Sequence, residues 1–314
     1  MRKTLLFGPV KSRRLRRSLG IEMVPRKVCT MDCIYCEVGK TILHTSERKD
    51  YYTWDLIEKS ILEAKEKEEI FDVFTFTGSG EPTLNIHFEK AVELSKKIIN
   101  KPIAVLTNST LLYIESIRKA LAKVDIVLPS LDAVKEESFR KINRTLPEFK
   151  PEEIVKNLKK LREEMQGEMW LEVLIVEGIN DNKEDLEALK KAIEEINPHK
   201  VQLNTVVRPA AYSIAKPVSF KKLQEIAKFW GNKVEIIVNK ERLDKIIAIK
   251  QTFEKEKLEE EVINYVKRRP ATLEELSQAF VLDEKAFQML LDELLSQGKI
   301  QTTIHENKVY YIAN

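Results

Sequence analysis

Cysteine is scarce in this sequence, and its distribution excludes a disulfide framework. The 314 residues contain three cysteines, Cys29, Cys33 and Cys36, all within eight positions of one another. Domains that depend on disulfides usually carry an even number of cysteines spread along a short secreted chain. Three clustered thiols are instead typical of a metal or redox site, so we expect the function to depend on this segment.

Glycine and long apolar runs are scarce as well. Nine glycines, with 43% apolar and 33% charged residues, predict a folded, helix-rich globule rather than a disordered chain. No apolar run is long enough to span a bilayer, and residues 1–10 lack the apolar stretch of a secretory signal. We therefore expect a cytoplasmic protein with no membrane partner.

Strand and helix patterns alternate through the first 240 residues. Apolar runs predict strands at 18–24, 71–77, 103–107, 125–130, 169–176, 200–207 and 234–238. Helical spacing predicts helices at 53–69, 88–100, 111–123, 152–165, 183–196 and 220–230. No glycine-rich dinucleotide fingerprint follows any strand, so the α/β fold predicted is a full or partial TIM-type (β/α) barrel. Functional residues should then lie at the carboxyl ends of the strands.

The pattern changes near Leu258. Helices are predicted to 268, to 280 and over 283–297, followed by a hairpin of 300–304 and 309–312 joined at Glu306 and Asn307. This order indicates a winged helix-turn-helix. We expect residues 1–240 to form the barrel, 241–257 a helical linker and 258–314 the winged-helix domain.

Basic residues are concentrated at the N-terminus, although the net charge is only +3. Residues 1–27 contain nine basic side chains and a single acid, Glu22. This basic arm is either a solvated surface segment or a phosphate-binding patch. In contrast, residues 270–314 contain seven acids and three lysines, so the predicted recognition helix would be repelled by phosphates. A protein partner, or packing against the barrel, is the better interpretation of the winged helix.

The cysteine segment, Cys29-Thr-Met-Asp-Cys33-Ile-Tyr-Cys36, has the spacing C-x3-C-x2-C with Tyr35 before the third cysteine. It resembles the signature of the radical S-adenosylmethionine (SAM) superfamily. The resemblance implies that the three thiolates hold a 4Fe-4S cluster whose fourth iron binds SAM. It also implies reductive cleavage of SAM to a 5'-deoxyadenosyl radical, with the electron coming from an external donor. A zinc site completed by His44 is the alternative.

Further segments extend this resemblance. Gly78, Ser79, Gly80 and Glu81 look like the Gly-Gly-Glu motif that binds the SAM ammonium group in the family. The other residues that the resemblance assigns to SAM are Tyr35, Thr107, Asn108, Ser130, Asp132 and Asn204, most of them at predicted strand ends. Turn and helix-cap chemistry also places Asn, Ser and Asp at such positions. No catalytic residue is assigned.

Cysteine number restricts the branch of the superfamily. Phe7-Gly-Pro-Val and Ser12-Arg-Arg-Leu resemble a branch related to wyosine-forming tRNA enzymes. Archaeal wyosine synthases carry extra cysteines for a second cluster, and methylthiotransferases also need more thiolates than this chain has. We therefore expect single-cluster hydrogen abstraction.

Three functions are compatible with these features. The leading hypothesis is a radical SAM enzyme that modifies tRNA or another RNA, which docks on the basic arm near the barrel mouth. An alternative is radical activation or modification of a protein or peptide presented by the winged helix. A second alternative is an iron-sulfur, redox-sensing regulator that binds DNA, against which the acidic recognition helix argues.

Overall fold

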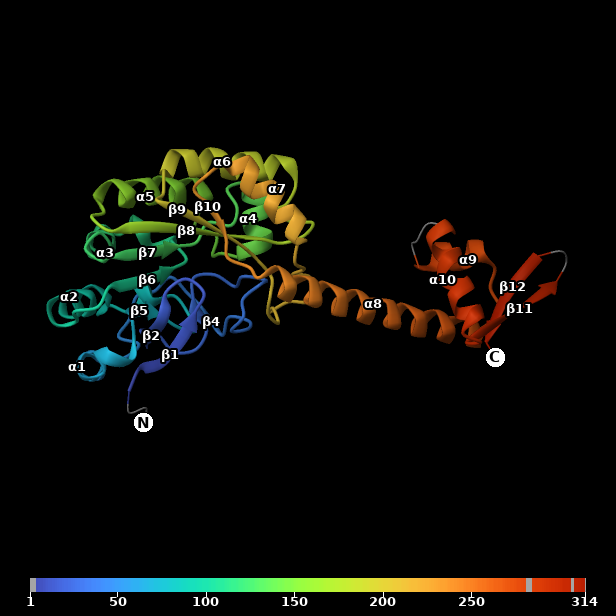
Figure 1. Ribbon diagram of the computed structural model, residues 1–314, viewed down its shortest axis with the longest axis horizontal. Coiled ribbons are helices and arrows are strands. Elements are labelled where there is room, and N and C mark those ends of the chain that lie inside the picture. The colour runs from blue at the N-terminus through green and yellow to red at the C-terminus, as the bar shows by residue number, and fades with distance from the viewer. Residues whose placement is uncertain (1–3, 281–283, 306–307, 314) are drawn as a thin grey trace. The chain divides into compact units, whose positions relative to one another are not determined.

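The computed structural model describes residues 4–280, 284–305 and 308–313 and divides the chain into two compact units (Figure 1). The first unit spans Met1–Leu243 and the second Asp244–Asn314. Helix α8, Lys240–Arg268, begins in the first and continues in the second, so the expected linker residues 241–257 lie within it. In the described part of the chain, no helix is both long and apolar enough to cross a membrane.

An eight-stranded sheet forms the centre of the first unit. Its strands are β1 Leu6–Ser12, β2 Arg16–Glu22, β5 Val73–Thr77, β6 Ile103–Thr107, β7 Ile126–Pro129, β8 Glu168–Ile175, β9 Lys200–Thr205 and β10 Val234–Ile236. They pair in this order, antiparallel between β1 and β2 and parallel elsewhere. Among the described strands, β1 and β10 are end strands that do not pair with each other. The α/β fold is therefore a partial barrel.

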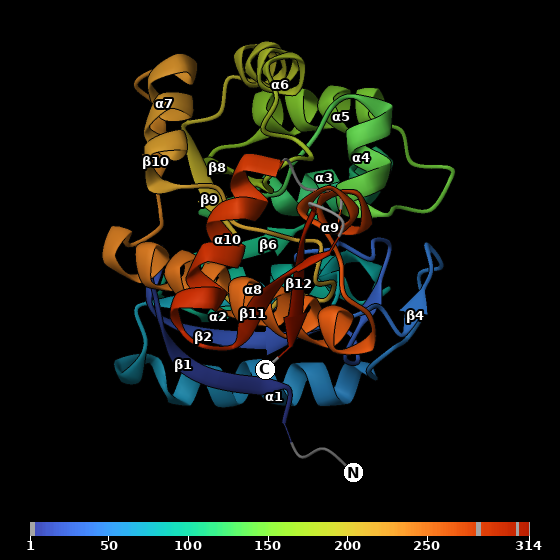
Figure 2. The same ribbon diagram turned by 90° about the vertical axis from the view of Figure 1, so that its right-hand side faces the viewer.

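Helices connect the parallel strands, as parallel pairing requires. They are α1 Trp54–Glu66, α2 Phe88–Ile98, α3 Glu115–Leu121, α4 Glu136–Asn143, α5 Pro151–Glu164, α6 Lys183–Ile196 and α7 Phe220–Trp230, with short 3-10 turns η1 Glu68–Ile70, η2 Pro82–Leu84 and η3 Thr110–Tyr113. Helices α1, α2, α3, α5 and α6 contact one another in this order along the sheet (Figure 1). Helix α1 lies beside β1 and β2 in both views (Figure 1, Figure 2).

Helix α6 begins and ends where its local sequence predicts. The side chain of Asn182 caps its first turn by accepting a hydrogen bond from Asp185 N at 2.9 Å. Its buried face includes Leu186 and Ile193, at the spacing of two helical turns. At its end, Asn197 adopts a left-handed conformation with φ +52° and donates to Ile193 O. The predicted helix 183–196 has these same bounds.

A buried apolar cluster lies in the interior of the partial barrel. Leu15, Val73, Ala104 and Leu128 form a buried cluster near the amino ends of the strands. Closed barrels fill their interior with such layers. Beside this cluster, the hydroxyls of Ser18 and Thr75 form a 2.7 Å hydrogen bond in the middle of β2 and β5. The remaining interior is lined by both polar and apolar side chains and is open as a cavity.

The N-terminal segment is a β-hairpin of the sheet and not a free arm, which corrects the sequence-based description. β1 was not predicted because Gly8 and Pro9 interrupt its strand pattern, but proline is tolerated on an edge strand such as this one. Arg14 points inward and pairs with Glu172 at 2.7 Å. Arg17 pairs on the surface with Asp72 at 2.8 Å. Only part of the basic charge is therefore free for a partner.

The second unit contains the rest of α8, then α9 Leu273–Phe280, α10 Glu284–Ser296 and the antiparallel strands β11 Ile300–His305 and β12 Lys308–Ala313. Its own buried core includes Val262, Leu276, Phe287, Leu291 and Tyr311. Of the predicted elements, Asp283 and the turn at Glu306 and Asn307 lie outside the described residues.

Candidate active site

The three cysteines follow β2 at the carboxyl end of the parallel strands. Cys29 ends the short strand β3, Val28–Cys29, which pairs with β4, Leu43–His44. Cys33 and Cys36 follow in a turn closed by a 3.1 Å hydrogen bond from Cys36 N to Cys33 O. All three thiols are partly buried and none forms a disulfide. Barrel enzymes have their active sites at this end of the strands.

Each cysteine sulfur receives one nitrogen donor. Asn108 Nδ2 donates to Cys29 Sγ at 3.4 Å, and Asn143 Nδ2 donates to Cys33 Sγ at 3.6 Å. Lys27 Nζ donates to Cys36 Sγ at 3.1 Å. Hydrogen bonds to sulfur stabilise thiolates and tune iron-sulfur clusters. Sequence reasoning had singled out Asn108, whereas it missed Lys27 and Asn143.

Burial disfavours the thiolate form in the metal-free protein. It raises the pKa of Cys29 to about 11, with a further contribution from the negative charge of Glu81. Burial and the charge of Asp132 raise the pKa of Cys33 even further. Metal ligation needs thiolates, so binding of iron at neutral pH must release protons from this loop.

The donor set fits an iron-sulfur cluster better than a single zinc ion. His44 Nε2, the predicted fourth zinc ligand, is hydrogen-bonded to the carbonyl oxygen of Thr30 at 3.0 Å. Within the described residues, no three His, Cys, Asp or Glu side chains converge as ligands of one ion would. Thiolates that bind separate irons of one cubane do not have to converge in this way, and three cysteines leave its fourth iron open.

The Gly78–Glu81 segment packs directly against the cysteine loop. Gly78 has φ +147°, a conformation that side chains rarely allow. A Cβ atom on Gly80 would lie 2.1 Å from Val28 O. Hydrogen bonds from Lys27 N to Ser79 O, at 2.8 Å, and from Glu81 N to Val28 O, at 3.1 Å, join the two segments. The glycines thus allow the end of β5 to support the cysteine loop.

The carboxylate of Glu81 is buried and fully engaged within the chain. Its Oε1 accepts hydrogen bonds from Thr83 N, Thr83 Oγ1 and Thr107 Oγ1, and its Oε2 accepts from Asn108 N at 2.7 Å. Burial raises the pKa of Glu81, and these hydrogen bonds oppose the increase. Glu81 therefore joins the ends of β5 and β6. Its predicted contact with the SAM ammonium group stays a prediction.

The carboxylate of Asp132 accepts hydrogen bonds from three other segments of the chain. Its Oδ2 accepts from Tyr35 Oη at 2.5 Å and from Asn143 Nδ2 at 2.7 Å, and its Oδ1 accepts from Leu174 N at 2.9 Å. Burial raises the pKa of Asp132 to about 6, against the effect of these hydrogen bonds. Tyr35 and Asp132, two residues predicted to bind SAM, are thus direct partners.

The interior of the partial barrel contains a cavity of about 540 Å³, which part of the predicted SAM-binding residues line. Four of them line it, Tyr35, Gly78, Ser79 and Asn204, together with Cys36. Gly80, Glu81, Thr107, Asn108, Ser130 and Asp132 belong to adjacent segments but not to its lining. The interior pair of Arg14 and Glu172 also borders the cavity, and Asn204 Nδ2 donates to Glu172 Oε1 at 3.2 Å.

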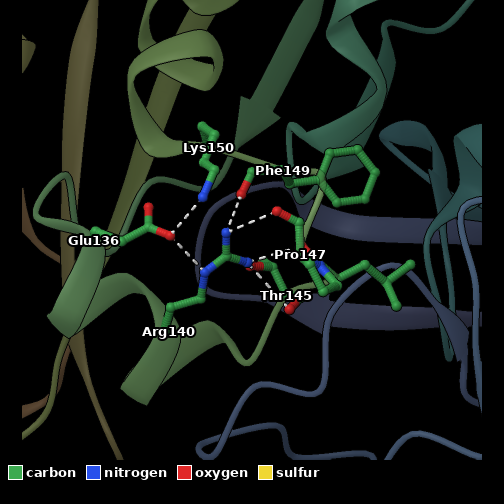
Figure 3. Close-up of polar contacts among 7 residues, drawn as sticks. Glu136, Arg140, Thr145, Pro147, Phe149 and Lys150 are labelled. Carbon is green, nitrogen blue, oxygen red and sulfur yellow. Dashed lines mark hydrogen bonds and ion pairs between the residues drawn. The ribbon is translucent and has the colours of Figure 1, made fainter.

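Helix α4 was not predicted, yet it positions Asn143 and the cysteine loop. The last carbonyls of α4, on Ile142 and Asn143, accept hydrogen bonds from Ile34 N and Asp32 N at 3.0 and 3.1 Å. Figure 3 shows how Arg140 anchors the helix by donating to the carbonyls of Thr145, Pro147 and Phe149. The i,i+4 pair of Glu136 and Arg140, also drawn there, is the sequence signal that could have revealed α4.

Comparison with known proteins decides the family. The profile described as the Radical SAM superfamily matches residues 23–193, which include all three cysteines and the Gly78–Glu81 segment. The chain belongs to the radical SAM superfamily. Members of this superfamily use a 4Fe-4S cluster and SAM, so the protein is a radical SAM enzyme with these two cofactors, and the donor set described above fits them.

Several relatives align with most of the radical SAM chain. A UPF0026 protein, MJ1312, from Methanocaldococcus jannaschii is 33% identical over 99% of this chain and 96% of its own length. A protein called GTPase Obg from Brachyspira hyodysenteriae is 33% identical over 98% of this chain, which spans only 45% of that relative. A probable RNA methyltransferase from Myxococcus xanthus is 25% identical over 58% of this chain and 51% of its own.

Solved structures share the fold. A radical SAM methyltransferase from Sphaerobacter thermophilus has a TM-score of 0.50 and 16% identity, covering 70% of this chain and 65% of its own. At this identity the likeness supports the barrel architecture and says nothing of the substrate.

Proposed function

We propose that this radical SAM enzyme modifies a nucleobase of RNA, with tRNA included in that class. One observation carries the proposal: the same cavity borders Cys36 and the cations Lys11, Arg13 and Arg14 of the β1–β2 hairpin. A nucleotide could therefore bind its phosphates on the hairpin while its base enters the cavity beside the cofactors. RNA-modifying enzymes commonly act on bases that are unpaired or turned out of the stack.

The chemistry follows from the cofactors. When bound, the reduced cluster supplies one electron that cleaves SAM into methionine and a 5'-deoxyadenosyl radical, which takes a hydrogen atom from the substrate. The electron is proposed to come from an external one-electron donor. The chain itself provides the cavity and its polar groups, which orient SAM and substrate.

Polar groups in the cavity suit a base better than an apolar substrate. Arg14 provides donors, Glu172 provides acceptors and Asn204 provides both. Nucleobases likewise present donors and acceptors side by side on one edge. A strongly anionic group would be attracted by Arg14 but repelled by Glu172, so the phosphates should stay outside.

Two further features support RNA. Lys11 and Arg13, which are exposed and border the cavity, can contact phosphates. The Phe7–Val10 and Ser12–Leu15 segments, which resemble the branch related to wyosine-forming tRNA enzymes, build this hairpin. We include the branch assignment in the proposal, and the relative named a probable RNA methyltransferase agrees with it.

A protein substrate is the second candidate, because the second unit exposes apolar side chains next to acidic ones. Met289 on α10 is 69% exposed and Ile304 on β11 is 74% exposed. Glu284 and Asp292 on α10 are exposed too. We assign this unit to the winged-helix class from its order of helices and hairpin. Its surface suits a basic protein better than nucleic acid.

RNA binding at low salt, with and without the hairpin cations, tests the proposal. The double variant Lys11→Glu, Arg13→Glu should bind bulk tRNA about tenfold more weakly, and its affinity should depend less on salt because fewer counterions are released. The matched control Lys119→Glu, Lys183→Glu reverses two exposed charges on α3 and α6 and should bind like the parent. Both variants should keep their iron.

Two outcomes would reject RNA as the substrate. One is a parent protein that binds no RNA at low salt. The other is an iron-replete hairpin variant that binds RNA as tightly as the parent. Co-purification of a protein instead of RNA would favour the second candidate.

A further inference from the structure

Lys27 is a buried cation beside the cysteine loop. Its side chain and backbone together are only 3% exposed, and it precedes the C-x3-C-x2-C segment. Its Nζ lies 3.1 Å from Cys36 Sγ. Among the residues that the structure describes, no Asp or Glu carboxylate lies within ion-pair distance of Lys27. A buried ammonium group without a carboxylate partner is costly unless another negative charge compensates it.

The backbone holds Lys27 in this place. Its φ is +59°, the left-handed conformation that non-glycine residues rarely adopt. Lys27 N donates to Ser79 O at 2.8 Å, and Lys27 O accepts from Ile42 N and Leu43 N, each at 3.0 Å. These bonds connect it to the Gly78–Glu81 segment and to β4. These bonds fix the backbone of Lys27, and the burial of its side chain together with the contact to Cys36 Sγ places the Nζ beside the cysteine loop.

The other two sulfurs receive weaker donors. Asn108 and Asn143 are neutral amides at 3.4 and 3.6 Å from Cys29 and Cys33. Lys27 is thus the one charged side chain that donates to a cysteine sulfur in the described part of the chain, and its contact is the shortest of the three. Charge-assisted hydrogen bonds are about twice as strong as neutral ones.

We propose that Lys27 is a positioning residue that favours the reduced state of the cluster and so sets its reduction potential. Reduction adds one negative charge to the cluster and its thiolates, close to the Lys27 ammonium group. In a partly buried site this attraction is stronger than in water, so it stabilises the reduced form more than the oxidised form. The compensating charge of the cluster also explains why the cation is tolerated there. The inference depends on the cluster and is independent of the RNA substrate.

An EPR-monitored redox titration of the cluster-loaded protein, without SAM, tests this role. Lys27→Met removes the donor and the charge. At a fixed potential it should lower the ratio of reduced to oxidised cluster at least tenfold, which corresponds to a reduction potential at least about 59 mV lower for a one-electron couple. Lys27→Gln can still donate without a charge and should shift the potential in the same direction by less. Lys27→Arg keeps the charge and should stay near the parent.

Lys40→Met is the matched control, because Lys40 is an exposed lysine close to the same loop whose Nζ lies 4.7 Å from the ring centre of Tyr212. The Lys40→Met variant loses the same unit of charge as Lys27→Met but loses no contact to sulfur. The reduction potential of its cluster should equal that of the parent. Iron content and thermal stability are measured for every variant, since a purely structural Lys27 would change these and leave the potential unchanged.

Two results would overturn the proposal. The first is a Lys27→Met potential equal to that of the parent; weaker SAM binding by the same variant, measured separately, would then make Lys27 a SAM ligand. The second is folded Lys27→Met and Lys27→Gln proteins that hold no iron, which would assign Lys27 to cluster assembly. Because none of these measurements uses RNA, their outcome is separate from that of the RNA-binding test.

Discussion

Asp132 shows how one buried carboxylate can connect the site and make it depend on pH. Its oxygens join Tyr35 of the cysteine loop, Asn143 of α4 and the backbone of Leu174 in β8. Burial is the largest effect on its pKa, which rises from 3.8 to about 6 in spite of the three donors. The charged form is thus less stable in the folded protein than in the unfolded chain.

The contribution of Asp132 to the stability of the apoprotein should therefore decrease as the pH rises from about pH 4 to pH 6. In this pH range Asp132 keeps its proton in the folded state and loses it in the unfolded chain. The unfolding free energy of the parent, relative to Asp132→Asn, should fall by up to about 3 kcal/mol over this window and then level off. Urea denaturation of both metal-free proteins at a series of pH values measures this difference. A difference that does not change with pH would contradict the prediction.

At the scale of elements, the site depends on segments that support one another at the carboxyl ends of the strands. The end of β5 supports the cysteine loop through the close approach of Gly80 to Val28, and the end of α4 supports it through Asp32 and Ile34. Both contacts are made by backbone groups. Small backbone shifts in either element should therefore change the geometry of the thiols.

Gly80→Ala should disrupt this support, since its Cβ would lie 2.1 Å from Val28 O. We expect a loss of about 3 kcal/mol in unfolding free energy, and substoichiometric iron after reconstitution. Denaturation and iron analysis measure the two effects. Gly178→Ala is the control, because a Cβ there meets no atom within 4 Å and is disfavoured only by φ +71°. Normal iron loading of Gly80→Ala would show that the loop can move away without losing its ligands.

At the scale of the whole molecule, the described site residues lie in the first unit. Every cysteine, every predicted SAM-binding residue and Lys27 precede Leu243, and the second unit has its own core. Domains with separate cores can usually fold alone.

A protein lacking residues 258–314 should therefore fold, hold its cluster and cleave SAM at a rate within about threefold of the parent. Formation of 5'-deoxyadenosine by the reduced, iron-loaded truncation is the measurement. If a folded and cluster-loaded truncation cannot cleave SAM, the second unit contributes directly to the active site.

The amino-acid sequence by itself determined the family, the cofactors and the α/β class. These features depend on local information: the spacing of three cysteines within one loop, the glycines of residues 78–80 and the regular alternation of strand and helix patterns. Helix α6 was predicted to the residue because its cap and apolar face are coded within its own segment. The SAM-binding roles of the strand-end residues are still predictions, and of the ten residues assigned to SAM the structure places Tyr35, Gly78, Ser79 and Asn204 in the lining of one cavity.

Only the tertiary structure decided which side chains meet the cysteines. Lys27, Asn108 and Asn143 come from three separate segments, and no pattern in any one segment indicates that they share a target. Likewise, the N-terminal basic residues belong to an edge hairpin because β2 pairs with β5. Arg14 points into the interior, where it forms an ion pair with Glu172 on β8. Such pairings depend on the packing of distant strands, which the local sequence pattern does not encode.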